Sequence, residues 1–156
     1  MARLRSIRRP LRRFAQVGSR RRALVVEAVT WLLLARLALI LVPFPKLARR
    51  IGTFVPPADP RVAHAAASRD DSRIAEDISW AVTRAARHVP FKAVCLPQAM
   101  AARVMLKRRG VASVMHFGAA KGEAKPLNAH AWLDAAGVEV TGYPVAANFA
   151  EIACFV

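Results

Sequence analysis

The sequence predicts one α+β domain in which helices come first and a small antiparallel sheet follows. Apolar residues recur at helical spacing up to about residue 109, and short alternating segments follow from residue 111 onwards. This order of helices and then strands is typical of α+β proteins. A chain of 156 residues with 55% hydrophobic content also suits a single domain with a substantial core.

The first 22 residues predict a basic, flexible arm that precedes a domain over residues 23–156. Residues 1–50 carry 13 Lys and Arg against the single acid Glu27, and the whole chain has a net charge of +15. Such a charge attracts acidic peptides, anionic membrane surfaces and nucleic acids alike. Nucleic acid is not expected as a partner, because the arm contains few aromatic residues on which bases could stack.

Residues 23–44 predict an apolar helix, and the prolines after it indicate a connector that ends near residue 60. The segment is almost long enough to cross a bilayer. However, Glu27 and Arg36 interrupt it, and a charge near the centre of a span costs about 2.5–3.5 kcal/mol. We expect a largely buried helix over a core, with contact to a membrane surface as the next alternative and a true span as the last. The long basic lead argues against a signal peptide. Two cysteines are too few to staple a secreted domain, so we expect a cytoplasmic protein, with membrane association as the alternative.

Two more helices and three strands are expected in the core over residues 61–156. The helix over residues 72–87 is indicated by apolar spacing and ends before Pro90. The helix over residues 96–109 has Pro97 in its first turn and basic residues followed by glycine at its end. The strands are expected over residues 111–118, 128–134 and 137–142, and a tight turn near residues 135–137 joins the last two.

Cys95 is the candidate nucleophile, because it lies at the start of the helix over residues 96–109. Unpaired N–H groups and aligned peptide dipoles at a helix start stabilise both a thiolate and the oxyanion of an acyl-transfer reaction. Gln98, in the first turn, could line such a site, but we favour the alternative of a solvated helical glutamine. The alternative for any lone cysteine is a buried, inert thiol. We favour that alternative for Cys154, which has no helix start nearby.

His130 is the candidate base on the neighbouring sheet. Alternation along residues 128–134 places His130, Trp132 and Asp134 on one face of a strand. A purely structural histidine is the alternative, and His116 is a weaker candidate base. The other two histidines are expected to be structural or solvated: His64 and His88. We predict no metal and no cofactor, because the histidines are dispersed and neither cysteine has a CxxC partner.

From about residue 22 to the end, the chain resembles the lasso peptide leader peptidases, the transglutaminase-like cysteine peptidase part of lasso peptide biosynthesis protein B. The matching stretches are Cys95-Leu96-Pro97-Gln98-Ala99, Leu106 to Val111, His116-Phe117-Gly118 and Ala129-His130-Ala131-Trp132. The resemblance implies a transglutaminase-like or papain-like core, with Cys95 and His130 removing the leader from a ribosomally made precursor through an acyl-enzyme. It also implies three partners, which are the precursor peptide, a small leader-binding recognition protein and a ring-closing cyclase.

Two other functions remain open at this point. The same Cys95 and His130 pair suits a transglutaminase-like acyltransferase, in which an amine replaces water as the acceptor. The basic arm and the apolar helix also suit a non-catalytic adaptor that binds a peptide or makes peripheral contact with a membrane.

The chain departs from this family at one position. The family commonly carries an Asp about twelve residues after the histidine, where it orients the imidazole, and Gly142 stands there in this sequence. A three-residue loop pairs Asp134 with Val138 and places Gly142 opposite His130. Asp134 then lies about 13 Å from His130 along the strand. We therefore expect the orienting group to be a backbone carbonyl, a hydroxyl such as that of Thr141, or a residue from elsewhere.

Overall fold

The computed structural model describes residues 18–63, 67–121 and 127–156. Most of the predicted arm and His64 lie outside these ranges. The helices are α2 (Ser19–Leu41), α3 (Phe44–Ile51), α4 (Arg69–Ala86) and α5 (Cys95–Lys107). The strands are β1 (Phe54–Val55), β2 (Val114–Lys121), β3 (Leu127–Ala135), β4 (Val138–Thr141) and β5 (Ala150–Phe155). They form one antiparallel sheet in the order β1-β5-β2-β3-β4, with 3-10 turns at Pro60–Val62 and Val145–Asn148. The predicted α+β class is confirmed.

Capping residues and prolines in the sequence account for where two of the helices begin. Ser68 and Asp71 form a capping box at the start of α4, in which each side chain receives the other residue's backbone N–H. Pro45 lies in the first turn of α3, where its missing N–H leaves no bond unmade. That short helix was not predicted, because we interpreted the prolines around it as a connector.

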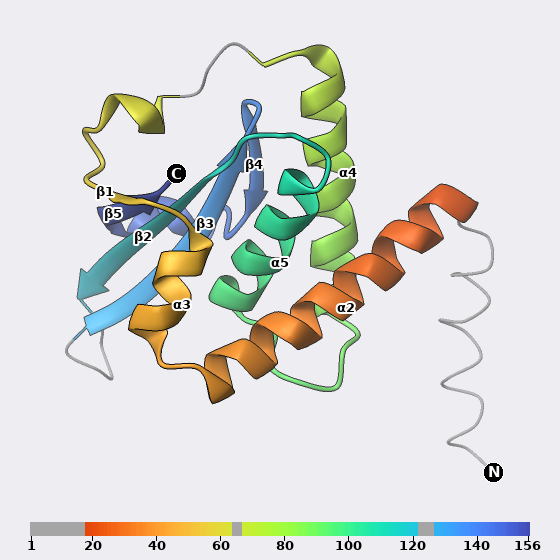
Figure 1. Cartoon of the computed structure of the whole chain (residues 1–156), viewed down its shortest axis with the longest axis horizontal. Helices are drawn as coiled ribbons and strands as arrows, with labels where there is room; N and C mark the ends of the chain where they lie inside the picture. Colours follow the sequence, from red (N-terminus) through yellow and green to blue (C-terminus); the bar gives the residue numbers. More distant parts are fainter. Residues whose placement is uncertain (1–17, 64–66, 122–126) are drawn as a thin grey trace.

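The helices cover one face of the sheet. In Figure 1, α5 lies between α2 and the strands, and it contacts both of them. The shared core includes fully buried side chains from each layer, namely Leu32, Ile78, Leu106, Met115 and Leu133. Successive residues of a strand point to opposite faces of the sheet. Met115 and Leu133 face the helices, so the residues next to them along β2 and β3 point away from the helices.

The hairpin between β3 and β4 has a tighter turn than the sequence analysis predicted. Its turn consists of Ala136 and Gly137, both left-handed with φ of 52° and 76°, as a two-residue hairpin turn requires. Val138 consequently pairs with Ala135, so the predicted pairing of Val138 with Asp134 is wrong. The register then shifts between Asp134 and Leu133: Asp134 pairs with Glu139, whereas Leu133 pairs with Thr141.

A half-buried guanidinium joins three segments of the chain. Arg103 on α5 donates hydrogen bonds to the carbonyl oxygens of Ile51, Ser113 and Phe155, at 2.8, 2.7 and 3.0 Å. These carbonyls come from the end of α3, the approach to β2 and the end of β5. Burial lowers the pKa of Arg103 from its ordinary value. The three carbonyl oxygens compensate this charge for the water that partial burial removes.

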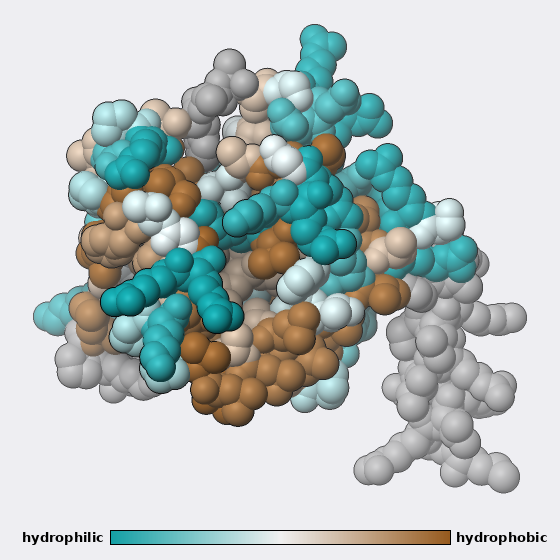
Figure 2. All heavy atoms as spheres, in the orientation of Figure 1, coloured by the Kyte–Doolittle hydropathy of each residue, from teal (hydrophilic) through white to brown (hydrophobic). Residues whose placement is uncertain are grey.

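Helix α2 covers the core, but it is not largely buried as predicted. Of its most apolar 18-residue window, 28% is buried inside the protein. The buried stripe consists of Leu24, Val25, Ala28, Leu32 and Ala35. The outward face is also apolar, and its exposed residues include Val26, Leu33, Leu37, Ile40 and Leu41. Figure 2 shows this surface in brown, beside the hydrophilic surface of α3. By length and composition alone, α2 is apolar enough to cross a membrane.

Glu27 connects α2 to the end of α5. Its carboxylate lies 2.6 Å from Arg109 and 3.3 Å from Arg108. The hydrogen bond from Arg109 is the main reason that the pKa of Glu27 is lowered from its ordinary 4.5. A lowered pKa contributes stability above the unfolded-state pKa, and this contribution is lost as the pH falls through the folded-state value.

Glu27→Gln is therefore expected to lower the free energy of unfolding by about 0.5–1 kcal/mol at pH 7, since the pair is partly exposed. The difference from the natural chain should shrink as the pH falls below about 4.5, the ordinary pKa of this carboxyl. Urea unfolding at a series of pH values measures this difference in the free energy of unfolding. Asp77→Asn is the control, because Asp77 lies 3.5 Å from a largely exposed Arg20 and should change little. A Glu27→Gln deficit that does not vary with pH would contradict the electrostatic explanation.

Candidate functional site

Cys95 is the first residue of α5 and is half-buried. The preceding residue, Val94, has extended backbone and makes no side-chain cap, and the first turn of the helix contains no acid. The Gln98 side chain donates a 2.6 Å hydrogen bond to the Ala93 carbonyl oxygen and so braces the loop before Cys95. The N–H groups at this helix start are therefore not occupied by a capping side chain.

His130 lies on β3 with one ring nitrogen held by the backbone. Its Nε2 is 2.8 Å from the carbonyl oxygen of Gly142. A carbonyl oxygen can only accept a hydrogen bond, so Nε2 carries the proton and Nδ1 of the neutral ring is free to act as a base. The ring stacks between Phe149 and Trp132, at centroid distances of 4.9 and 6.1 Å.

Cys95 and His130 lie toward the same end of the sheet but on different sides of it. Figure 1 shows α5 and β3 running in the same direction, so both residues occur early in elements that begin at one end. However, His130 shares a strand face with Trp132, whereas Leu133 of the other face packs with α5. In the part of the chain that the structure describes, no hydrogen bond joins Cys95 to His130.

The other residues proposed to orient His130 have different neighbours. Asp134 accepts a 2.6 Å hydrogen bond from the Tyr143 hydroxyl and lies 3.3 Å from Nε2 of His116. The Thr141 hydroxyl is buried, and among the described residues it has no hydrogen-bond partner. Of the three kinds of orienting group expected from the sequence, the backbone carbonyl is the one that forms a hydrogen bond with this ring among the described residues.

Trp132 is a buried spacer between two histidines. Its indole stacks on the His116 ring, with ring centroids 5.4 Å apart and an angle of 5° between the planes, and it also stacks on the His130 ring. Gly118 makes room for it, since a Cβ at position 118 would lie 2.7 Å from the indole and 2.9 Å from the Cβ of Phe149. The aromatic row thus runs from Phe149 through His130 and Trp132 to His116.

At the far end of this row the structure brings together a cluster that sequence analysis missed. The fully buried Cys154 has its Sγ 3.6 Å from Nδ1 of His116 and 2.8 Å from a carboxylate oxygen of Glu151. Glu151 also contacts Nδ1 of His116 directly. Asp134 approaches the opposite ring nitrogen, so His116 lies between two carboxylates.

The electrostatics of this cluster argue against Cys154 as a nucleophile. Burial raises the pKa of the Cys154 thiol to about 12, and the neighbouring Glu151 carboxylate adds to the effect. Burial alone lowers the pKa of His116, but Asp134 and Glu151 outweigh it, and the net pKa is raised. A thiol that remains protonated and sealed from solvent is a poor nucleophile.

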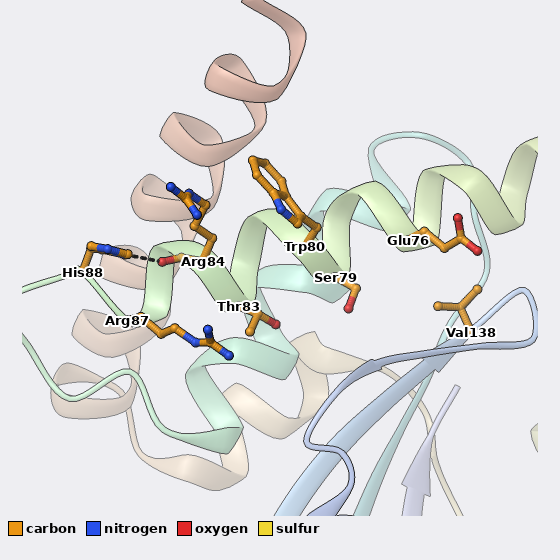
Figure 3. A pocket seen from close by; sticks show the side chains of 8 residues that line it. All are labelled: Glu76, Ser79, Trp80, Thr83, Arg84, Arg87, His88 and Val138. Atoms are coloured by element: carbon orange, nitrogen blue, oxygen red, sulfur yellow. Dashed lines mark hydrogen bonds between the residues drawn. The ribbon is translucent and has the colours of Figure 1, made fainter. Parts of the chain in front are cut away.

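The pocket on the outer side of α4 contains none of the predicted catalytic residues. Figure 3 shows it lined by Glu76, Ser79, Trp80, Thr83, Arg84, Arg87, His88 and Val138. Nδ1 of His88 lies 2.8 Å from the Arg84 carbonyl oxygen at the end of the helix. This contact fits the structural role expected of His88.

Comparison with known proteins identifies the family. The family model for the transglutaminase-like superfamily matches residues 38–154, which include Cys95, His116, His130 and Cys154. Searches of curated proteins and of solved structures found no match. Members of this superfamily are typically cysteine peptidases or acyltransferases. With three quarters of its length matched, the chain belongs to the transglutaminase-like superfamily.

Proposed function

We propose that this chain is a cysteine peptidase that removes the leader from a ribosomally made lasso-peptide precursor. Cys95 is the nucleophile and His130 the base. The observation that carries the proposal is the position of Cys95, half-buried at the uncapped start of α5 within the matched superfamily region. The resemblance of the stretches around Cys95 and His130 to lasso peptide leader peptidases supports the choice of substrate.

In the proposed reaction, Nδ1 of His130 takes the thiol proton and the Cys95 thiolate attacks the carbonyl carbon at the leader–core junction. The N–H groups at the start of α5 stabilise the oxyanion. The imidazolium then protonates the departing amine of the core peptide, and the leader remains as a thioester on Cys95. Water, deprotonated by His130, hydrolyses this acyl-enzyme and restores the thiol.

This reaction requires His130 to move toward Cys95 when the substrate binds. The part of β3 that carries His130 lies beyond the end of its pairing with β4, which stops at Leu133 and Thr141. Catalytic hydrogen bonds are often long or poorly aligned in a free enzyme, and here the ring must also leave its stack between Phe149 and Trp132.

The proposed reaction also specifies its partners and location. The new α-amine on the core peptide is the group that a separate cyclase would join into a ring. A small leader-binding protein would hold the leader, and the cytoplasm would supply the freshly made precursor. These partners follow from the proposed substrate class.

The test is mass spectrometry of a candidate precursor incubated with this chain and its leader-binding partner. Two fragments whose masses sum to the precursor plus one water support a peptidase. A conjugate between the leader and an added amine would instead identify an acyltransferase. An intact precursor that also fails to protect Cys95 from a thiol-reactive probe would contradict both enzymatic functions.

A non-catalytic adaptor at a membrane surface is the second candidate, favoured by the exposed apolar face of α2. Lys46, Arg49 and Arg50 of α3 are exposed beside this face, and an apolar helix face next to cations suits anionic lipid. Binding to vesicles of anionic lipid that weakens as salt is added, and does not depend on Cys95, would support the adaptor. Binding that neutral vesicles match would count against it.

A further inference from the structure

We propose that His116, Glu151 and Cys154 form a zinc site on the sheet face opposite the helices. Their donor atoms, Nδ1, a carboxylate oxygen and Sγ, all lie within 4.8 Å of one another. The three residues come from β2 and β5, which are adjacent in the sheet. This site is separate from the proposed nucleophile, which lies at the start of α5 on the other side.

A bulge in β5 creates the donor set. Cys154 pairs with His116, whereas Glu151 pairs with Gly118, two residues further along β2. In a regular strand, residues three apart point to opposite faces. Here the register shifts between the pairs of Phe117 and Gly118, which leaves Ile152 as the extra residue. The bulge therefore turns Glu151 to the face that carries Cys154.

The spacing of the thiol and the imidazole fits a tetrahedral zinc ion. Bonds of about 2.3 Å to sulfur and about 2.05 Å to nitrogen, at a tetrahedral angle, separate the two ligand atoms by about 3.6 Å. The separation of Cys154 Sγ from His116 Nδ1 is 3.6 Å. The Glu151 oxygen lies nearer, at 2.8 Å from Sγ and in direct contact with Nδ1 of His116. To admit the ion, this side chain must retreat by about 0.7 Å from the sulfur and by more from the nitrogen. Its side chain is 31% exposed and has room to do so.

A carboxylate lies near the other nitrogen of His116, on the side where a metal-bound histidine usually has one, but Nε2 makes no hydrogen bond among the described residues. Asp134 lies 3.3 Å from Nε2 and itself accepts a hydrogen bond from Tyr143. A carboxylate on the far nitrogen fixes the ring and increases its basicity toward the metal. Trp132 stacks on the imidazole in a nearly parallel plane and so fixes the orientation of that ring. The ring is thus already oriented with Nδ1 toward the thiol and Glu151.

The chemistry of these donors selects zinc rather than magnesium or calcium. One thiolate, one imidazole and one carboxylate make a mixed set of intermediate softness, whereas the hard cations prefer oxygen alone. Binding replaces the thiol proton of Cys154 and any proton on Nδ1 of His116, and both protons leave to solvent. The ion then balances the charges of the thiolate and Glu151. Water completes the fourth position through the exposed side of Glu151.

The direct test uses cobalt as a spectroscopic substitute for zinc. The full chain, freed of metal with a chelator, is titrated with Co²⁺ while the near-ultraviolet absorption of the cobalt–thiolate bond is recorded. We expect saturation at one equivalent and loss of the band when Zn²⁺ is added. Cys154→Ser should abolish the band, whereas Cys95→Ser should retain it, which makes the second thiol the matched control.

Two further measurements keep the outcome clear if Cys154→Ser folds poorly. Zn²⁺ should raise the melting temperature of the natural chain and of Cys95→Ser. Asp134→Asn should keep the cobalt–thiolate band but bind Zn²⁺ about 10–100-fold more weakly, as loss of the carboxylate behind a metal-bound histidine typically does. The proposal is overturned if the natural chain gives no saturable band, or if Cys95→Ser removes it.

Discussion

Cys95→Ala is expected to slow cleavage of the precursor by at least about 10³-fold and to leave the fold intact. Loss of a catalytic nucleophile removes the covalent route and leaves only the smaller contributions of binding and oxyanion stabilisation. The half-buried side chain makes no hydrogen bond in the described residues, so its removal should cost little stability. Initial rates from product masses, together with the melting temperature, measure both effects.

Val94→Ala is the matched control for this substitution. Val94 precedes Cys95 directly, and its side chain is 56% exposed, so cleavage should stay within a few-fold of the natural rate. Cys154 is not expected to rescue the variant, because its thiol is fully buried and its pKa is raised. Unchanged cleavage by Cys95→Ala would remove the basis for the peptidase proposal.

Gly142→Asp is expected to destabilise the protein by about 3 kcal/mol or more, although it introduces the acid that is common in the leader peptidases which the sequence resembles. Gly142 has φ of 92°, where a side chain is strained by about 1–3 kcal/mol. A Cβ there would also lie 2.6 Å from the Cβ of Trp132 and 2.8 Å from the Ala131 carbonyl oxygen. Neither atom is the tip of a flexible side chain, so the strand itself would have to shift. Urea unfolding gives the free energy.

Gly137→Asn separates strain from steric overlap. Gly137 also has positive φ, 76°, but a Cβ there meets nothing within 4 Å. Since asparagine tolerates left-handed backbone, this change should cost less than about 1 kcal/mol. If Gly142→Asp were as stable as the natural chain and cleaved faster, the carboxylate would be the missing orienting group, and the carbonyl contact to His130 would be dispensable.

Features set by local sequence could be predicted, as α4 and α5 show. The helix expected over residues 96–109 forms over Cys95–Lys107, and its start falls at the predicted nucleophile. For α4, the predicted start at residue 72 is three residues late, because the capping box of Ser68 and Asp71 was overlooked. Caps and glycine stops act within one helical turn, so the printed sequence contains the information needed to find them.

Features set by distant pairing could not be predicted. Strand β5 lacks clear alternation because its bulge leaves Ile152 60% exposed between residues that face the cluster. Consequently, the sequence pattern did not indicate that Glu151 and Cys154 could be ligands of one site. His116 lies 35 residues before Glu151, so local spacing did not connect it to them either. The hairpin register depended on the size of the turn, and a one-residue difference there changed every pair in β4.

The three bonds of Arg103 make the chain's last strand part of a cooperative unit that includes α3. Freeing the Phe155 carbonyl would leave a half-buried charge short of one partner, and the same guanidinium also holds the carbonyls of Ile51 and Ser113. Fraying of the carboxyl end and loosening of α3 should therefore occur in one opening event. Amide hydrogen exchange in these two segments would then share a common opening free energy, rather than falling off gradually toward the terminus.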